Sequence, residues 1–361
     1  MVVYWILLAI VILFFILYLV SNCSNLLSNY TAFNFFKSPV TKYIINRILL
    51  SCAILFSIAT IVFFLIQAVP NNELQVSSDS TFKKLLDYYK NILPFPKKTC
   101  TSSTLSNGVL VCNSYTTKIM NLGNSKYFMR NTSVWSIIKQ KCSISLLVGM
   151  IAYVFECIVS YPLGIFIARR NNRVLNKCFS GFYVFITSIP LSLLYYLLLL
   201  AFMLYFKLPT SFEINNLLSY IAPIASVTLT SVAIVSHWVS MYISTEAKKD
   251  YVTFARSKGL SEKAIFYKHI VRNALIPLIR TIPTSIVASI CGFYILEATF
   301  GIPGSGSTLV IAIKLGDSPL IQGLILFFSF ISVMAYIVSD LISLILDPRI
   351  KLGEDNVNEK H

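Results

Sequence analysis

Charged side chains are scarce in this 361-residue chain. They make up 12% of it, against about 25% in soluble domains, while apolar residues make up 56%. This balance excludes an ordinary soluble domain and indicates an integral membrane protein. Acids are rarer still, since 15 of them face 30 lysines and arginines. The cations lie in short connectors between apolar runs, so positive-inside topology explains them and we reject a nucleic-acid partner.

Residues for metal or redox chemistry are few and poorly spaced. There are three histidines and no HExxH motif, and no paired carboxylates occur, so a metal site has no support. None of the eight cysteines falls in a CxxC pair, which argues against a zinc or redox site. Cys100 and Cys112 share one polar segment, where a disulfide and two free thiols are both open alternatives.

Apolar runs, by contrast, are long and numerous. Seven stretches approach or exceed the roughly 20 residues that cross a bilayer: 2–20, 49–70, 142–168, 179–206, 214–243, 281–296 and 318–346. A kink is expected at Pro190 in the fourth. The first has no basic region before it and is longer than the apolar part of a usual signal peptide. We therefore favour a retained span over a cleaved signal.

Charge counts in the connectors predict the orientation. Four segments hold 3, 4, 8 and 3 lysines plus arginines, in the order 21–47, 169–177, 244–280 and 347–361. The alternate short connectors hold one each, so the four basic segments are expected in the cytoplasm. The segment 71–141 carries ten cations but, at over 60 residues, is long enough to escape this rule. The amino terminus is then outside and the carboxy terminus inside.

The most basic connector, Thr245 to Arg280, has a helical pattern with one break. Two short helices are predicted around a turn at Lys258 to Ser261, where Gly259 permits a tight turn. Ser261 can cap the second helix, with Glu262 in its first turn. An amphipathic connector that is merely solvated remains the alternative. Four residues are expected to face a partner or the membrane: Tyr251, Ala255, Ile265 and Ile270.

The letters DYVTFARSKGLSEKAIFYKHIVRNALIP, residues 250–277, closely resemble the cytoplasmic loop of dipeptide and oligopeptide ABC importer permeases. In that family the loop is a variant of the EAA loop, whose coupling helix docks on the ATPase subunit. Thr253-Phe254-Ala255 stands where the general pattern has Glu-Ala-Ala, and the peptide branch commonly lacks that acid too. The residues that the resemblance assigns to ATPase coupling are Tyr251, Ala255, Arg256, Lys258, Gly259, Leu260, Ser261, His269, Arg272, Asn273 and Pro277.

Further blocks resemble the same family. They are the outer loop at 297–306 with 317–323, the ending Leu346-Asp347-Pro348-Arg349-Ile350, and a first helix at 43–70. The resemblance implies an all-α polytopic membrane protein, a type I ABC importer (MetI-like) transmembrane domain of six core helices plus one extra amino-terminal helix. The implied parts are an extra helix and linker (1–42), the first core helix (43–70), an extracytoplasmic insertion (71–141), a permease core (142–353) and a tail (354–361).

By this resemblance the chain is a permease subunit of the cell membrane that imports oligopeptides or dipeptides and forms half of a translocation pathway. It is not itself an enzyme and binds no cofactor, because ATP and magnesium belong to the partners. Those partners are a second homologous permease, two cytoplasmic ATPase subunits and an extracytoplasmic substrate-binding protein, with membrane lipid around the spans. Nickel or glutathione is the alternative cargo, since the same branch also carries these.

Three carboxylates lie in or beside the spans, where charge is costly and often functional. Glu156, Glu297 and Asp340 are therefore candidates for the translocation path or a gate. Glu156 departs from the family's usual apolar residue. It could instead pair with a residue of the partner subunit, or sit near a kinked, water-filled region without a transport role.

Two other hypotheses, a serine protease and a nucleotide-binding loop, have little support in the sequence. An intramembrane serine protease would need Ser305 as nucleophile and His237 as base. The stretch 301–308 nearly fits a phosphate-binding loop, but Ser307 stands where that motif needs lysine, so nucleotide binding there is rejected.

Overall fold

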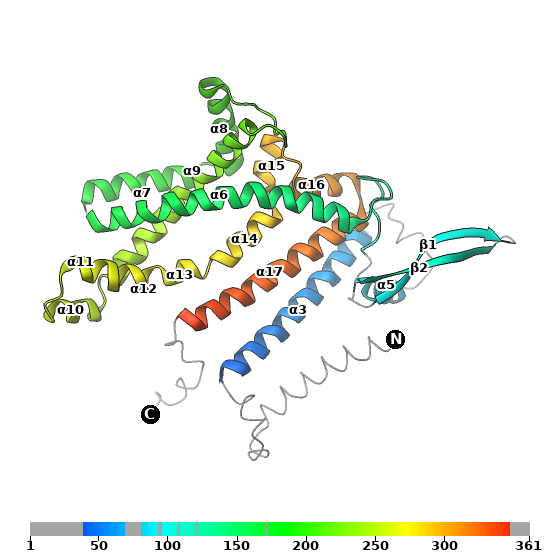
Figure 1. The fold of residues 1–361 in the computed structure, drawn as a ribbon, viewed down its shortest axis with the longest axis horizontal. Coiled ribbons are helices and arrows are strands. Elements are labelled where there is room, and N and C mark those ends of the chain that lie inside the picture. Colours follow the sequence, from blue (N-terminus) through cyan, green and yellow to red (C-terminus); the bar gives the residue numbers. More distant parts are fainter. Residues whose placement is uncertain are drawn as a thin grey trace, which may run out of the picture. The chain divides into compact units, whose positions relative to one another are not determined.

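The computed structural model describes residues 39–68, 81–92, 96–106, 109–119, 122–170 and 172–346 (Figure 1). The predicted first span at 2–20 and the predicted tail at 354–361 lie outside these residues. The described chain divides into two compact units. One contains the residues up to Trp135 together with Gly316–Val333, and the other contains Ser136–Leu315 and the residues from Met334 on.

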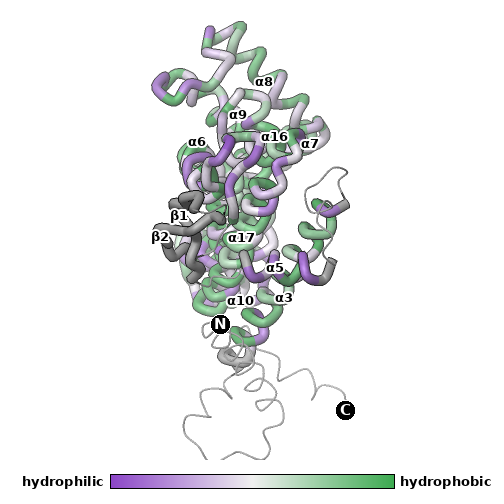
Figure 2. The backbone as a smooth tube through the Cα atoms, turned by 90° about the vertical axis from the view of Figure 1, so that its right-hand side faces the viewer, coloured by the Kyte–Doolittle hydropathy of each residue, from purple (hydrophilic) through white to green (hydrophobic). Residues whose placement is uncertain are grey.

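Five helical segments are long and apolar enough to cross a membrane: Tyr43–Gln67, Val134–Arg170, Leu218–Glu246, Glu262–Phe300 and Ser318–Leu346. A sixth span is obtained if a strongly bent helix pair, Val174–Ser188 with Leu191–Phe206, is counted as one. These six match the six apolar stretches predicted after residue 42. Their composition is visible in Figure 2, where the tube is coloured mostly as hydrophobic along α3 (Pro39–Ala68) and α17 (Ser318–Leu346).

The bent pair lies where a single kinked span was predicted. Helix α7 (Arg173–Ser188) and helix α8 (Leu191–Phe206) meet at 104°. Ile189 between them is extended, with φ −84° and ψ 132°, because a residue before proline is pushed out of the helical region. The position of the break is confirmed, but its size makes two helices out of one predicted helix.

In the first unit, helix α5 (Thr81–Ile92) packs on α3 through an aromatic contact. The rings of Phe56 and Tyr89 stack with centroids 4.9 Å apart. The hydroxyl of Tyr89 lies 2.6 Å from Thr60 Oγ1. A small core is completed by Phe63 and Tyr88, both buried. Helix α5 is therefore covered by α3 on the face that carries Tyr88 and Tyr89.

Strands β1 (Pro96–Ser106) and β2 (Val109–Ile119) pair antiparallel in a hairpin. No strand is predicted from the sequence, so this hairpin is an addition to the predicted all-α fold. Its register sets Cys100 opposite Tyr115 and Cys112 opposite Ser103. The two cysteines are therefore not cross-strand neighbours. Their side chains lie outside the described residues, and the disulfide stays a prediction.

A buried carboxylate, that of Asp317, closes the first unit just before α17. Its Oδ2 accepts hydrogen bonds from Ser125 Oγ at 2.6 Å and from three consecutive backbone amides, those of residues 126, 127 and 128, at 3.0, 3.0 and 3.1 Å. Burial opposes ionisation, but these hydrogen bonds outweigh it and hold the pKa of Asp317 below its usual value. One side chain thus fixes the loop that precedes α6.

In the second unit, helix α6 (Val134–Arg170) passes α9 (Leu218–Glu246) at a glycine. A Cβ atom on Gly164 would lie 2.7 Å from the carbonyl oxygen of Ser236 and 2.6 Å from Val239 Cβ. Only glycine permits that approach. Farther along α9, a cluster of buried apolar residues that includes Val227 and Phe300 forms the core.

The remainder of this unit includes helices α14 (Ile282–Cys291), α15 (Tyr294–Phe300) and α16 (Ser305–Leu315). The segment 297–306, predicted as part of an outer loop, therefore lies largely in the end of α15 and the start of α16. Gly292 separates α14 from α15 with φ +80°, and Gly301 ends α15 with φ +67°. Both conformations favour glycine, which explains why the chain can change direction twice in so short a segment.

Candidate functional site

The candidate site is the polar loop 244–280, which begins where α9 ends at Glu246. Helix α10 (Asp250–Ser257) follows after a short turn, with Asp250 in its first turn where the helix dipole favours an acid. Val252 and Ala255 lie on one face of α10 and are buried. The opposite face is open, with Phe254 60% exposed. The buried apolar face and the exposed Arg256 and Lys258 agree with the sequence pattern, whereas Phe254 is an apolar residue on the exposed face.

The predicted break at Lys258 to Ser261 is present. Gly259 ends α10 with φ +76°, and its position has open space around it. Ser261 then caps α11 (Glu262–Ala264), accepting a long hydrogen bond of 3.4 Å from the amide of Ala264. The two-helix prediction and its capping residue are both confirmed.

The chain beyond α11 differs from an ordinary helix. Ile265–Val271 forms a π-helix, η1, followed by α12 (Arg272–Ala274) and α13 (Ile276–Ile279). Such wide turns are rare and often occur at functional sites. Nothing in the sequence pattern predicted it, because the widened turn changes the helical period over only seven residues.

Three of the four residues expected to face a partner or the membrane are buried inside the chain. Ala255, Ile265 and Ile270 are 7%, 0% and 3% exposed and pack with Val239 and Ile243 of α9. That part of the prediction is wrong. An apolar helix face requires a cover, and here α9 and η1 supply it, which spacing alone cannot reveal.

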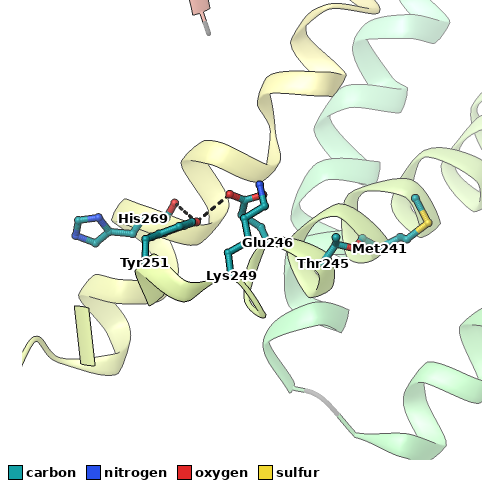
Figure 3. Close-up of polar contacts among 6 residues, drawn as sticks. All are labelled: Met241, Thr245, Glu246, Lys249, Tyr251 and His269. Carbon is teal, nitrogen blue, oxygen red and sulfur yellow. Dashed lines mark hydrogen bonds and ion pairs between the residues drawn. The ribbon is translucent and has the colours of Figure 1, made fainter. Parts of the chain in front are cut away.

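Tyr251 ties α10 to both of its neighbours (Figure 3). Its hydroxyl donates to Glu246 Oε1 at 3.0 Å and lies 3.4 Å from the backbone oxygen of His269. Lys249 pairs with the same Glu246 at 2.7 Å. The imidazole of His269 points away from this contact (Figure 3). The polar network therefore positions α10 against the end of α9 and against η1.

The outer surface of the loop carries the charges. Arg256 forms an ion pair with Glu262 across the turn, with Nε and Oε1 2.9 Å apart. Lys258 Nζ lies 4.5 Å from the centroid of the Phe254 ring. Arg169 at the end of α6 donates to the hydroxyl of Tyr267 at 2.7 Å. The remaining predicted coupling residues lie at the surface or are half-buried: Leu260, Ser261, Arg272, Asn273 and Pro277.

A family model, that of the binding-protein-dependent transport system inner membrane component, matches residues 160–352, which is more than half of the 361. The chain belongs to this family. With five or six apolar helices it is a multi-pass membrane protein.

Three proteins that are similar in sequence to this inner membrane component have names that state a cargo. The oligopeptide transport system permease protein AmiC of Streptococcus pneumoniae serotype 4 is 34% identical over 214 residues, which cover 58% of this chain and 43% of AmiC. The chain thus aligns with less than half of that relative. The dipeptide transport system permease protein DppB of Lactococcus lactis subsp. cremoris is 26% identical, covering 87% of this chain and 100% of DppB. The nickel import system permease protein NikB of Staphylococcus aureus is 26% identical, covering 89% and 95%.

The three carboxylates predicted for a path or gate of this inner membrane component have different surroundings. Glu297 is 3% exposed and is saturated by the chain itself: Ser145 Oγ donates to Oε1 at 2.6 Å and the amide of Ser307 donates to Oε2 at 2.7 Å. Glu156 on α6 is half-buried and lies beside the hydroxyl of Ser231 on α9. Asp340 lies half-buried on α17.

Glycines make room for the Glu297 carboxylate. A Cβ atom at Gly292 or at Gly304 would collide with Glu297 Oε1. The network continues to Ser305, whose amide donates to Ser145 Oγ at 2.8 Å. Sequence reasoning selected Glu297 but missed its partners, because Ser145 is 152 residues away and nothing in either local pattern connects them.

The protease alternative finds no geometry in its favour. Ser305 is fully buried and its hydroxyl donates to the carbonyl oxygen of Ile290 at 2.8 Å. His237 stacks on Tyr183, with ring centroids 4.1 Å apart and nearly parallel planes. A nucleophile needs a base within hydrogen-bond reach. The structure gives each of these residues a different partner.

Proposed function

We propose that this chain is the membrane-spanning permease subunit of an ATP-driven ABC importer for oligopeptides or dipeptides. It forms half of a translocation pathway with a second, homologous permease. Two ATPase subunits on the cytoplasmic side bind ATP and magnesium, and an extracytoplasmic binding protein delivers the cargo. The amino terminus then lies outside and the carboxy terminus in the cytoplasm, as the basic connectors predict.

One observation carries the proposal: the 244–280 loop folds into a short helix whose inner face is fixed and whose outer face is free. Val252 is fully buried on the inner side, while Phe254 and Arg256 are exposed on the other. The loop contains eight cations and three acids, so its surface suits an acidic partner. A lever between an ATPase and the spans needs such a rigid, exposed end.

Peptide cargo is supported by two of the three relatives above, which are named as oligopeptide and dipeptide permeases. Nickel is the second candidate, because the nickel permease matches over 89% of this chain. Transport of radiolabelled peptides and of nickel by the reconstituted importer, with its own binding protein, separates the two.

The coupling role is tested by Gly259→Leu. We expect loss of ATPase binding and of ATP-dependent uptake, because leucine at φ +76° is strained and adds bulk to the docking turn. Gly301→Leu is a matched control, since Gly301 also ends a helix with positive φ and open space around it. It should bind the ATPases as the wild type does. Wild-type uptake by an assembled Gly259→Leu importer would contradict the proposal.

We propose a separate role for the segment 71–141 as an outer cap that contacts the binding protein. Its described part contains α5 and the β1–β2 hairpin, which pairs only with itself among the described residues. Replacing residues 96–119 by a short glycine–serine linker should weaken binding-protein docking, measured by surface plasmon resonance on the reconstituted permease. Unchanged docking and uptake would contradict this role.

A further inference from the structure

Helix α6 has two sides of different chemistry in the middle of its spanning length. One side is apolar and exposed, including Val154, Phe155 and Ile158 at 50%, 50% and 62% exposure. The other side carries polar residues at helical spacing: Tyr153, Glu156, Cys157, Ser160 and Tyr161. These are half-buried or buried. Glu156 lies at the edge of this polar side, where its carboxylate reaches Ser231 of α9.

The carboxylate of Glu156 has little support from its own chain. The hydroxyl of Ser231 on α9 lies beside it, and among the described residues it forms no ion pair. Glu297 shows what a self-sufficient buried acid looks like here, with a hydroxyl and a backbone amide on its two oxygens. A charge in a spanning segment is costly unless it is paired. A cation from outside this chain would therefore stabilise the Glu156 carboxylate.

Two hydroxyls next to the Glu156–Ser231 contact are also unused. Ser160 is one helical turn from Glu156 on the same side of α6, and Thr228 is one turn from Ser231 on α9. Both side-chain oxygens are buried and have no hydrogen-bond partner in the described part of the chain. Other hydroxyls of α9 are satisfied by their own helix, as that of Ser236 is by Val232. Buried hydroxyls without partners are uncommon.

These groups match the needs of an ammonium ion, which has three donors, no acceptor and one positive charge. A carboxylate with hydroxyl oxygens beside it offers both the charge and the acceptors. The cation is not expected from a neighbouring subunit, because Glu156 lies on the side of α6 turned toward α9 and away from the exposed apolar side.

We propose that Glu156, with Ser231 and the hydroxyls of Ser160 and Thr228, forms a recognition site for a cationic group of the cargo as it passes through the permease. The group is an ammonium, either the free amino terminus of a peptide or a basic side chain. This inference rests on the proposed function as a peptide importer.

The test uses the complete importer in proteoliposomes and two pairs of labelled peptides. Ala-Ala-Ala against its N-acetyl form tests the amino terminus, and Ala-Lys-Ala against Ala-norleucine-Ala tests the side chain. Uptake within each pair is expressed as a ratio and compared between wild type and Glu156→Gln, which keeps the size and the hydrogen-bonding capacity of the side chain but removes its charge. The binding protein is the same in both, so its own preference cancels.

We expect Glu156→Gln to lower the cationic-to-neutral ratio about tenfold in at least one pair, because one ion pair in a desolvated site is lost. Glu213→Gln, an exposed acid between α8 and α9, should leave both ratios unchanged. Unchanged ratios for Glu156→Gln would overturn the inference. So would an equal loss for both members of each pair together with a lower melting temperature, which would indicate a cation of a neighbouring subunit. Absence of peptide uptake by the wild type would instead refute the proposed function.

Discussion

The acids of two segments have opposite surroundings. In the segment 292–317, Glu297 and Asp317 are each almost fully buried and accept hydrogen bonds from serine hydroxyls and backbone amides of their own units. In the 244–280 loop, Asp250 and Glu262 are exposed, and Glu262 only forms an ion pair across a turn. In the first segment, the chain itself supplies hydrogen-bond donors to both acids. The loop leaves Asp250 and Glu262 at the surface, as a docking element should, whereas Glu246 at its start is mostly buried and bonded to Tyr251 and Lys249.

Removal of the Glu297 carboxylate is expected to have the largest effect on stability. We expect Glu297→Ala to lower the free energy of unfolding by about 3 kcal/mol, because it leaves a cavity and strands the donors of Ser145 and Ser307. Glu262→Ala in the other segment should cost less than about 1 kcal/mol. Thermal denaturation of both variants in detergent checks this. Equal losses would remove the distinction between the segments.

Each segment contains a glycine in a left-handed backbone conformation. Gly292 and Gly259 have nearly the same φ, +80° and +76°, so alanine is strained at both. At Gly292 the new methyl group would also collide with the Glu297 carboxylate and lie 2.9 Å from the amide nitrogen of Gly306, whereas at Gly259 it meets open space. We expect Gly259→Ala to cost about 1 kcal/mol and Gly292→Ala at least twice that. Melting temperatures that fall equally would show that strain alone decides.

Asp317 allows a pH test of the buried acids. Its pKa is lowered in the folded chain, so its ionised form stabilises the fold. That contribution is complete above its ordinary pKa of 3.8 and is lost as the pH falls below this toward the folded value. The melting temperature of wild type should therefore approach that of Asp317→Asn on acidification from pH 7 to about pH 3. A constant difference between them would contradict the assigned role.

The smallest effect is expected at the surface pair of Arg256 and Glu262. Their side chains are 52% and 70% exposed, so the ion pair should contribute less than about 1 kcal/mol. A double-mutant cycle with Arg256→Gln and Glu262→Gln measures it. A much larger coupling energy would mean that the loop is as self-contained as the segment around Glu297. The same Arg256→Gln variant should weaken ATPase binding more than it affects folding.

Local chemistry predicted much of this molecule. Six predicted apolar stretches correspond to five long apolar helices and one bent helix pair, because length and hydropathy are local properties. The turn at Gly259 followed from the needs of a tight turn and a capping serine. Pro190 likewise predicted the position of the break between α7 and α8, because a proline restricts the residue before it. Each of these signals lies within a few residues of the feature that it specifies.

Features that depend on distant residues were missed. The partners of Glu297 and Asp317 lie 152 and 192 residues away, and no pattern within one segment connects them. The burial of Ile265 was misassigned because its cover comes from α9. The hairpin at 96–119 was not predicted, since its polar strands lack the alternation that reveals a half-buried strand.

The hydrogen bonds around Asp317 also set an order of events during synthesis. Ser125 leaves the ribosome long before its partner, which follows 192 residues later. At about 5–20 residues per second, the loop at 125–128 waits roughly 10–40 s for the carboxylate that holds it. Until then three consecutive backbone amides have no acceptor from this side chain. The first unit can therefore be completed only after residue 317 has been synthesised, 192 residues after Ser125.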